Sequence, residues 1–224
     1  SMSFIVIKFG GTSVSSGDNW HNIATICQRH AQAGKQVIVV CSAYSQVSNL
    51  LEKAIQAALI NQHHSIVEQI KGKYQSLLSD LSLDAQLLTT WFEQLSNWLH
   101  GISLLGEASP KARANILSLG ELMMSQLGNH YLAQQGLDSD WLDARTLLTT
   151  RRMPGGDAIN YLAARCQAQA NLEKINALQK AGKQIYVTQG FIAHNDEQET
   201  VLLGRGGSDT SAGLIAATLQ ADAC

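Results

Sequence analysis

Short apolar runs alternate along the chain with longer amphipathic segments, and this pattern predicts the first structural elements. The segments 3–9 and 36–41 are apolar almost throughout. Between them lies a segment of helical periodicity, which Asp18 or Asn19 is expected to cap and which ends before Gly34. Apolar strands joined by a helix are typical of a parallel sheet that is covered on both faces.

A long helical block follows. Residues 46–135 are rich in Leu, Gln and Ala and show a helical pattern almost throughout. Breaks are expected near Gln62, Ser82, 106–110 and Gly120, where turn-forming residues or changes of pattern interrupt it. The block therefore predicts several helices inserted between the strands.

Strands return after this block. The expected elements are a strand over 137–142, a loop over 151–157, a helix over 158–181, a strand over 184–188, a hairpin over 191–203 and a helix over 211–221. This order predicts an α/β fold: a mainly parallel sheet sandwiched by helices, with 46–135 as a helical insertion. The last helix invites a further strand, so we expect residues 2–224 to be part of a longer domain.

Composition and charge exclude several classes of protein. The formal net charge is −2 and there is no basic run, so a nucleic acid is not expected as the main partner. No apolar run approaches the ~20 residues of a membrane helix. The cysteines form no CxxC pair and no zinc pattern, which favours free thiols in a cytoplasmic protein; they are Cys27, Cys41, Cys166 and Cys224. The pair His63–His64 is expected to be exposed, and no metal site is predicted.

Two glycine-rich turns at opposite ends of the chain carry the strongest chemical signal. Residues 8–13 read Lys-Phe-Gly-Gly-Thr-Ser after a strand, and residues 204–209 read Gly-Arg-Gly-Gly-Ser-Asp before a helix. Backbone N–H groups at such turns and helix starts attract phosphate. Neither turn matches the Walker A or GxGxxG pattern. The pair indicates a phosphoryl-transfer site assembled from both ends of the chain.

Charged residues in these turns suit that chemistry. Lys8 ends the first strand, where open α/β sheets bind ligands, and would stabilise charge on phosphate oxygens unless it is only a solvated lysine. Arg205 lies between glycines and can hold a carboxylate or phosphate with two parallel hydrogen bonds. Asp209 lies in the first turn of its helix, where it would either complement the helix dipole or cap the helix, or else orient Lys8 or the substrate.

Other candidate ligands lie between the two turns. Glu121 stands among Leu and Met residues; if buried it needs a partner, which the ammonium group of a ligand would supply, and otherwise it faces solvent. Ser42 and Ser48 follow the second strand. Their hydroxyls would bind a phosphate or carboxylate, although Ser45 or Ser48 would also serve as a helix cap.

Taken together, these motifs resemble those of the aspartate kinases, which have the amino acid kinase fold. The matching segments, in chain order, are Lys8–Val14, Ser42-Ala43 with Ser48-Asn49, Gly120–Leu122, Trp141–Arg145, and Gln189–Phe191 with Leu203–Asp209. They extend over the whole chain. Gln46 stands where the family usually has glycine, and Ser48 stands where it usually has threonine.

The resemblance implies transfer of the γ-phosphoryl group of ATP to the β-carboxylate of L-aspartate, the first step toward lysine, threonine and methionine. That carboxylate is ionised (pKa about 3.9), so no general base is needed. Mg²⁺ would be carried by the ATP. The implied phosphate-binding residues are Lys8, Gly10, Gly11, Gly206 and Gly207. Asp209 is implied to orient Lys8. The implied substrate-binding residues are Ser42, Ser48, Glu121, Arg205 and Ser208, with Glu121 on the ammonium group and Arg205 on the α-carboxylate.

The resemblance also implies a longer parent protein. The family continues beyond Cys224 with a segment that holds the adenine and ribose, and then with regulatory domains. We therefore expect these residues to bind the amino acid and to show little kinase activity alone. The alternatives are a sister kinase acting on N-acetylglutamate, glutamate, carbamate or UMP, a non-catalytic amino-acid-binding fragment, and a helical block that makes contacts in a homo-oligomer.

Overall fold

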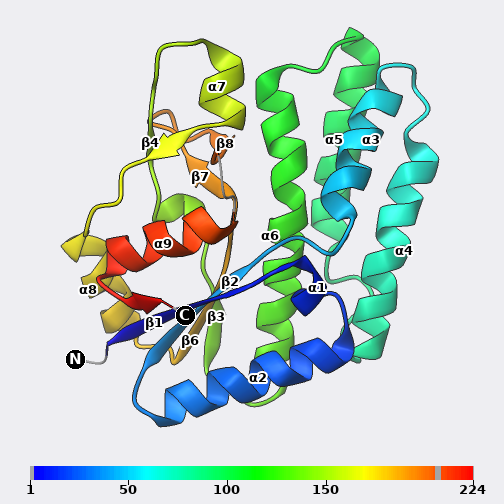
Figure 1. Ribbon diagram of the computed structural model, residues 1–224. Helices are drawn as coiled ribbons and strands as arrows, with labels where there is room; N and C mark the ends of the chain where they lie inside the picture. The colour runs from blue at the N-terminus through cyan, green and yellow to red at the C-terminus, as the bar shows by residue number, and fades with distance from the viewer. Residues whose placement is uncertain (1–2, 205–207, 224) are drawn as a thin grey trace.

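A parallel sheet lies at the centre of the molecule (Figure 1). The computed structural model describes residues 3–204 and 208–223, and of Ser208 and Asp209 only the backbone. Within this part, five strands pair in the order β3-β6-β2-β1-β9, and every pair is parallel. The strands are β1 (Phe4–Phe9), β2 (Gln36–Cys41), β3 (Ser139–Trp141), β6 (Ile185–Gln189) and β9 (Asp222–Ala223). The predicted α/β class is confirmed.

Alternation along the strands builds a core on each face of the sheet. Ile5 and Ile7 of β1 pack into the larger core with α2 (Gly17–Gln32) and α6 (Pro110–Gln134). The intervening Phe4 and Val6 pack into the second core, under α8 (Leu172–Ala181) and α9 (Ser208–Leu219). Burial on both faces explains why β1 and β2 are apolar at most positions.

The predicted helical block is confirmed, with one correction. It comprises α3 (Val47–Ala58), α4 (His64–Asp80), α5 (Thr89–Leu105) and α6, and Figure 1 shows these helices side by side. The breaks expected near Gln62, Ser82 and 106–110 occur, but the break at Gly120 is wrong because α6 runs through it. A Cβ atom at Gly120 would lie 2.7 Å from the Ala43 Cβ atom. This glycine therefore allows a close approach and does not end a helix. In the described part of the chain, no helix combines the length and apolar character needed to span a membrane.

The expected cap of α2 is also wrong. The cap of α2 is Ser16, whose hydroxyl accepts from the Asn19 N–H at 3.1 Å, so neither Asp18 nor Asn19 is the cap. A short helix, α1 (Gly11–Val14), precedes it within the glycine turn. Trp20 of α2 holds the end of α1 in place, since its indole N–H donates to the Val14 carbonyl at 2.9 Å.

The segment predicted as one helix over 158–181 is divided. Helix α7 (Asp157–Leu162) ends before β5 (Arg165–Cys166), which pairs with β4 (Thr150–Arg151), and α8 follows. A non-local strand pairing thus overrides the local helical pattern. The predicted hairpin is confirmed as β7 (Ile192–His194) and β8 (Thr200–Leu202).

Glu199, beside β8, ties this hairpin to two helices. Its carboxylate accepts hydrogen bonds from the Tyr161 hydroxyl of α7 at 2.7 Å and from the Asn195 amide at 3.0 Å. It also pairs with the Lys111 ammonium of α6 at 2.9 Å. These donors, with Asn195 the largest contributor, lower the pKa of Glu199 to about 2. Glu199 therefore holds α7 and the start of α6 against the hairpin.

We expect the variant Glu199→Gln to lower the free energy of unfolding, by no more than about 1 kcal/mol because solvent still reaches the carboxylate. A carboxyl whose pKa is depressed by folding stabilises the folded state above its unfolded pKa, and this contribution is lost as the pH falls through the folded value. Denaturant unfolding between about pH 7 and pH 2 should therefore show the two proteins converging in acid. A difference that is independent of pH would contradict the ionic role.

Candidate functional site

The first glycine turn, the loop after β2 and helix α6 meet around Ala43. A Cβ atom at Gly11 would lie 3.3 Å from the Ala43 carbonyl oxygen, and Gly120 approaches the Ala43 side chain on another side. The Ser42 N–H donates to the Phe9 carbonyl at 3.1 Å, which continues the pairing of β1 with β2 into this loop. Three motifs that are distant in the sequence are therefore in direct contact.

Glu121 is the most unusual residue of this junction. Glu121 is only 4% exposed, and its buried Oε1 atom has no hydrogen-bond partner among the described residues. Burial raises the pKa of Glu121 to about 8, although hydrogen bonding to the backbone of Glu121 itself and of Ala43 acts in the opposite direction. The expectation that Glu121 faces solvent is excluded. A buried carboxylate with a free oxygen is suited to a cationic ligand.

Lys8 lies at the carboxyl end of β1 and is half-buried. In the sheet it stands opposite Val40 of β2, which stands opposite Thr188 of β6. Val40 belongs to the core beneath α9, and α9 packs against β1. Side chains of one such row share a face of the sheet, so Lys8 lies on the face that α9 covers.

The first glycine turn leads from Lys8 into α1. Gly10 has an extended backbone and precedes the helix, and the Ser13 N–H donates to its carbonyl at 3.0 Å. A Cβ atom at Gly10 would meet nothing within 4 Å. The space next to the Gly10 Cα atom is therefore open. Gly11, in contrast, packs closely against the loop between β2 and α3, where a side chain would crowd the Ala43 carbonyl.

The second glycine turn is only partly described. Arg205, Gly206 and Gly207 lie outside the described residues. The backbones of Ser208 and Asp209 begin α9, as the helix start of the motif predicts.

The serine candidates differ in their positions. Ser42 is half-buried beside Ala43, whereas Ser48 lies exposed in the first turn of α3. Gln46, which replaces the usual glycine, has φ of 71°. That left-handed conformation favours glycine, which explains the family's preference. The Gln46 side chain accepts a hydrogen bond from the Asn49 amide at 3.0 Å.

A buried polar network behind Glu121 is not apparent from the sequence. The Gln189 amide donates to the Ser125 hydroxyl at 2.8 Å, and the Trp141 indole donates to the same oxygen at 2.9 Å. Ser125 lies one turn beyond Glu121 on α6. The network therefore fixes α6 against the carboxyl ends of β3 and β6. The Tyr74 hydroxyl of α4 donates to the Gly120 carbonyl at 3.1 Å and fixes α6 from the other side.

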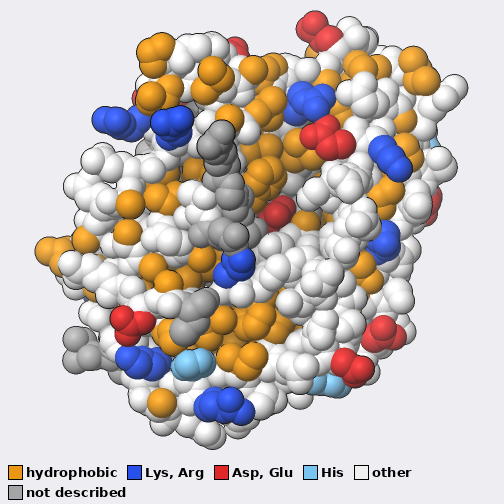
Figure 2. Space-filling model, viewed as in Figure 1, with side chains coloured by type: hydrophobic (Ala, Val, Ile, Leu, Met, Phe, Trp, Pro, Cys, Tyr) orange, Lys and Arg blue, Asp and Glu red, His pale blue; other side chains and the backbone are white. Residues whose placement is uncertain are grey.

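The surface around the junction is mixed in character. Figure 2 shows that apolar side chains gather between the regions of α7 and α6, with acidic and basic side chains at the borders of this area. The described residues on this face form no continuous basic surface of the kind that nucleic acids require. It suits a small ligand with charges of both signs.

Comparison with known proteins agrees with this geometry. The sequence signature of the amino acid kinase family matches residues 3–224, and the chain belongs to this family. It is 33% identical to an aspartokinase of Chlamydia pneumoniae and 30% identical to lysine-sensitive aspartokinase 3 of Escherichia coli, with 98% of the chain covered in each case. Its homologues are thus aspartokinases.

A solved structure provides the same relationship in three dimensions. The crystal structure of E. coli aspartokinase III in complex with aspartate and ADP matches 97% of this chain with a TM-score of 0.83 and 26% identity. The chain covers 46% of the Chlamydia protein, 48% of the E. coli protein and 47% of the solved chain. It therefore spans about half the length of these relatives.

Proposed function

We propose that this chain is the amino-acid-binding part of an aspartate kinase, which transfers the γ-phosphoryl group of ATP to the β-carboxylate of L-aspartate. The product would be 4-phospho-L-aspartate, the first intermediate toward lysine, threonine and methionine. The observation that carries the proposal is the buried Glu121 carboxylate with its unpartnered oxygen. An α-ammonium group of an amino acid would supply the missing donor and the missing positive charge.

The other roles are those that the resemblance to the aspartate kinases implies. Ser42 lies beside Ala43 and would contact the transferring group, and Ser48 would help to orient the substrate from the start of α3. Arg205 is proposed to hold the α-carboxylate, and Asp209 to orient Lys8. Ser208 is assigned to the substrate-binding set with them. No general base is required because the attacking carboxylate is ionised, so catalysis rests on positioning and charge stabilisation.

The residues present fit the phosphates of ATP. The half-buried Lys8 lies on the face covered by α9, whose backbone begins directly after the second glycine turn. Open space above Gly10 allows a phosphate to approach the backbone. We assign phosphate binding to Lys8, Gly10, Gly11, Gly206 and Gly207. Mg²⁺ carried by the nucleotide would neutralise part of the phosphate charge.

Ligand binding is the property that these residues are proposed to carry by themselves. The chain spans about half of the aspartokinases that it resembles, so the whole reaction is proposed for the whole protein. We expect little ATP-dependent acyl phosphate formation by the 224 residues alone. Robust turnover by this chain would contradict that expectation and would support the complete reaction here.

The decisive test is thermal unfolding with millimolar L-aspartate, L-glutamate or N-acetyl-L-glutamate. A ligand at 100 times its Kd stabilises the folded state by about 2.7 kcal/mol, which is a readable shift. We expect stabilisation by L-aspartate alone. Stabilisation by another of these ligands would assign the chain to a sister kinase, and the absence of any shift would overturn the proposal that these residues bind the amino acid.

The affinity for L-aspartate is also expected to depend on pH. Glu121 must lose its proton to pair with an ammonium group, and its pKa in the free protein is raised to about 8 by burial. Aspartate should therefore bind more tightly as the pH rises from about 6 to 8, with release of a proton. Isothermal calorimetry in buffers of different ionisation enthalpy would measure this proton. A constant Kd with no proton release would contradict the role of Glu121.

A further inference from the structure

A hollow at the start of α4 contains a cluster of histidines that the phosphoryl-transfer proposal does not use. It has a volume of about 410 Å³ and is lined by residues of α4, the turn before it, and α5, among them His63, His64 and His100. His63 is only 4% exposed, so the expectation that His63–His64 is an exposed pair is wrong for the first of the two. The two rings stack with their centroids 4.2 Å apart.

One ring nitrogen of His63 has no hydrogen-bond partner among the described residues. This atom, Nδ1, is buried. A buried nitrogen of this kind costs free energy unless a ligand or solvent molecule satisfies it. Such atoms are uncommon in folded proteins, and this one belongs to a residue that lines a hollow.

The helix start supplies further donors. His63 occupies the N-cap position of the 17-residue helix α4, and its side chain makes no capping hydrogen bond. Ile66 and Val67 both donate to the His63 carbonyl oxygen, which leaves the N–H groups of His64 and Ser65 at the open end of the helix. Helix N-termini of this kind attract anions.

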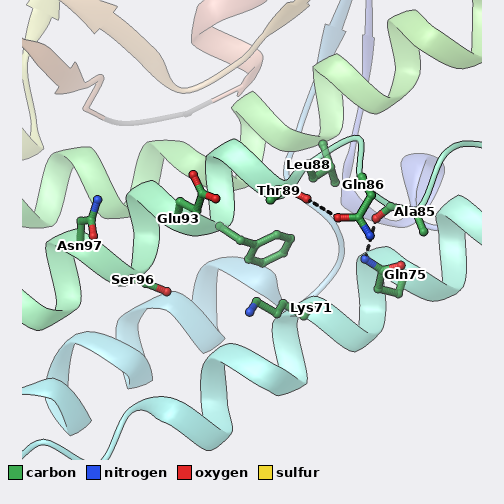
Figure 3. Close-up of a pocket in the computed structure, with 10 residues that line it drawn as sticks. Lys71, Gln75, Ala85, Gln86, Leu88, Thr89, Glu93, Ser96 and Asn97 are labelled. Atoms are coloured by element: carbon green, nitrogen blue, oxygen red, sulfur yellow. Dashed lines mark hydrogen bonds between the residues drawn. The ribbon is translucent and has the colours of Figure 1, made fainter.

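One ammonium group, that of Lys71, also reaches the hollow. Lys71 of α4 lines it and lies 3.4 Å from Glu68, whose side chain is largely exposed. Lys71, Ser96 and Asn97 also line the adjoining groove drawn in Figure 3, where Lys71 extends from α4 into the space beside α5. The described residues contain no group of three or more His, Cys, Asp or Glu placed to hold a metal ion. The hollow therefore has no metal-binding geometry among the described residues.

We propose that the hollow at the start of α4 binds a phosphate group, either as free inorganic phosphate or carried on a small metabolite. Its oxygens would accept from the His63 ring, from the first N–H groups of α4 and from the imidazole of His100. The Lys71 ammonium would supply positive charge. This site is formed by the helical block and does not depend on the proposed kinase reaction.

Binding at this site is expected to strengthen in mild acid. Burial, followed by the neighbouring His64 and His100, lowers the pKa of His63, which keeps its ring neutral in the free protein. The titratable and charged groups that face it are His64, Glu68 and Lys71 from α4 and His100 from α5. A bound phosphate anion would favour the protonated form of the His63 imidazole, because opposite charges stabilise one another.

The test measures the thermal unfolding midpoint of the full chain at about pH 6 and about pH 8. The added salts are millimolar inorganic phosphate, glycerol phosphate and, as the control for ionic strength, chloride. We expect a phosphate-dependent rise that is larger in acid. The variants His100→Gln and Lys71→Ala should weaken phosphate binding about tenfold or more, whereas His130→Gln, an exposed histidine elsewhere on α6, should behave like the unaltered protein. Unchanged unfolding midpoints in chloride would show that the variants fold.

Each outcome has a distinct meaning. A larger effect of glycerol phosphate than of inorganic phosphate would support the site and identify a phosphorylated metabolite as its ligand. The reverse order would support the site with free phosphate as its ligand. Equal shifts in all variants, or no shift beyond that of chloride, would overturn the proposal. The kinase proposal is unaffected by this result, because L-aspartate binding is measured separately.

Discussion

Replacing Glu121 by glutamine is expected to abolish stabilisation of the chain by L-aspartate and to make the free protein more stable. The carboxylate is buried, lacks a partner for Oε1, and has a pKa raised to about 8. Glutamine has nearly the same shape without the charge. The variant should therefore lose the ligand while it keeps the fold.

The gain in stability should depend on pH in a defined direction. The folded pKa of Glu121 lies above its ordinary value of 4.5, so the folded state holds a proton that the unfolded chain releases. The free energy of unfolding of the unaltered protein therefore falls as the pH rises from about 4.5 through 8. Near neutral pH, Glu121→Gln should be more stable by about 1–3 kcal/mol, and the two proteins should converge near pH 4.

Denaturant unfolding at several pH values, with and without millimolar L-aspartate, tests both the loss of aspartate binding and the gain in stability. Glu107→Gln is the matched control, because Glu107 is exposed shortly before α6. It should retain the response to aspartate and show little change in stability. If Glu121→Gln responded to aspartate as the unaltered protein does, Glu121 would not be the ammonium ligand, even if the stability change appeared as expected.

Gly128→Ala is expected to destabilise the fold strongly. A Cβ atom at Gly128 of α6 would lie 2.2 Å from the Trp20 Cη2 atom and within 2.9 Å of two further ring atoms. Trp20 is fully buried, and its indole N–H is held by the Val14 carbonyl. The ring cannot move away without losing that hydrogen bond or disturbing α2, so we expect a loss of about 2–4 kcal/mol.

Denaturant unfolding of Gly128→Ala measures this loss. A control variant and a compensating double variant are measured in the same way. Gly72→Ala in α4 places a methyl group where nothing lies within 4 Å, and should stabilise the protein by up to about 1 kcal/mol through helix propensity. The double variant Gly128→Ala/Trp20→Phe has a smaller ring at the contact and should lose less than the sum of its single variants. If Gly128→Ala unfolded at the same midpoint denaturant concentration as the unaltered protein, the steric argument would be contradicted.

Local patterns predicted most of the secondary structure because burial on both faces of the sheet leaves a clear mark. The strands at 4–9, 36–41 and 185–189 are apolar on both faces, and the long helices carry regular apolar positions. The segment 158–181 could not be predicted in this way. Its interruption depends on the pairing of Arg165–Cys166 with Thr150–Arg151, a contact that local composition does not specify.

The candidate site shows the same division. Residue order was sufficient to predict the α/β class, the family motifs and the chemical types at Lys8 and Glu121, because these depend on local pattern and on residue chemistry. The burial of Glu121, the close contact of Gly120 with Ala43 and the enclosure of His63 became apparent only from the packing of the folded chain. Burial and contact are decided by segments far apart in the chain, whose positions no local pattern records.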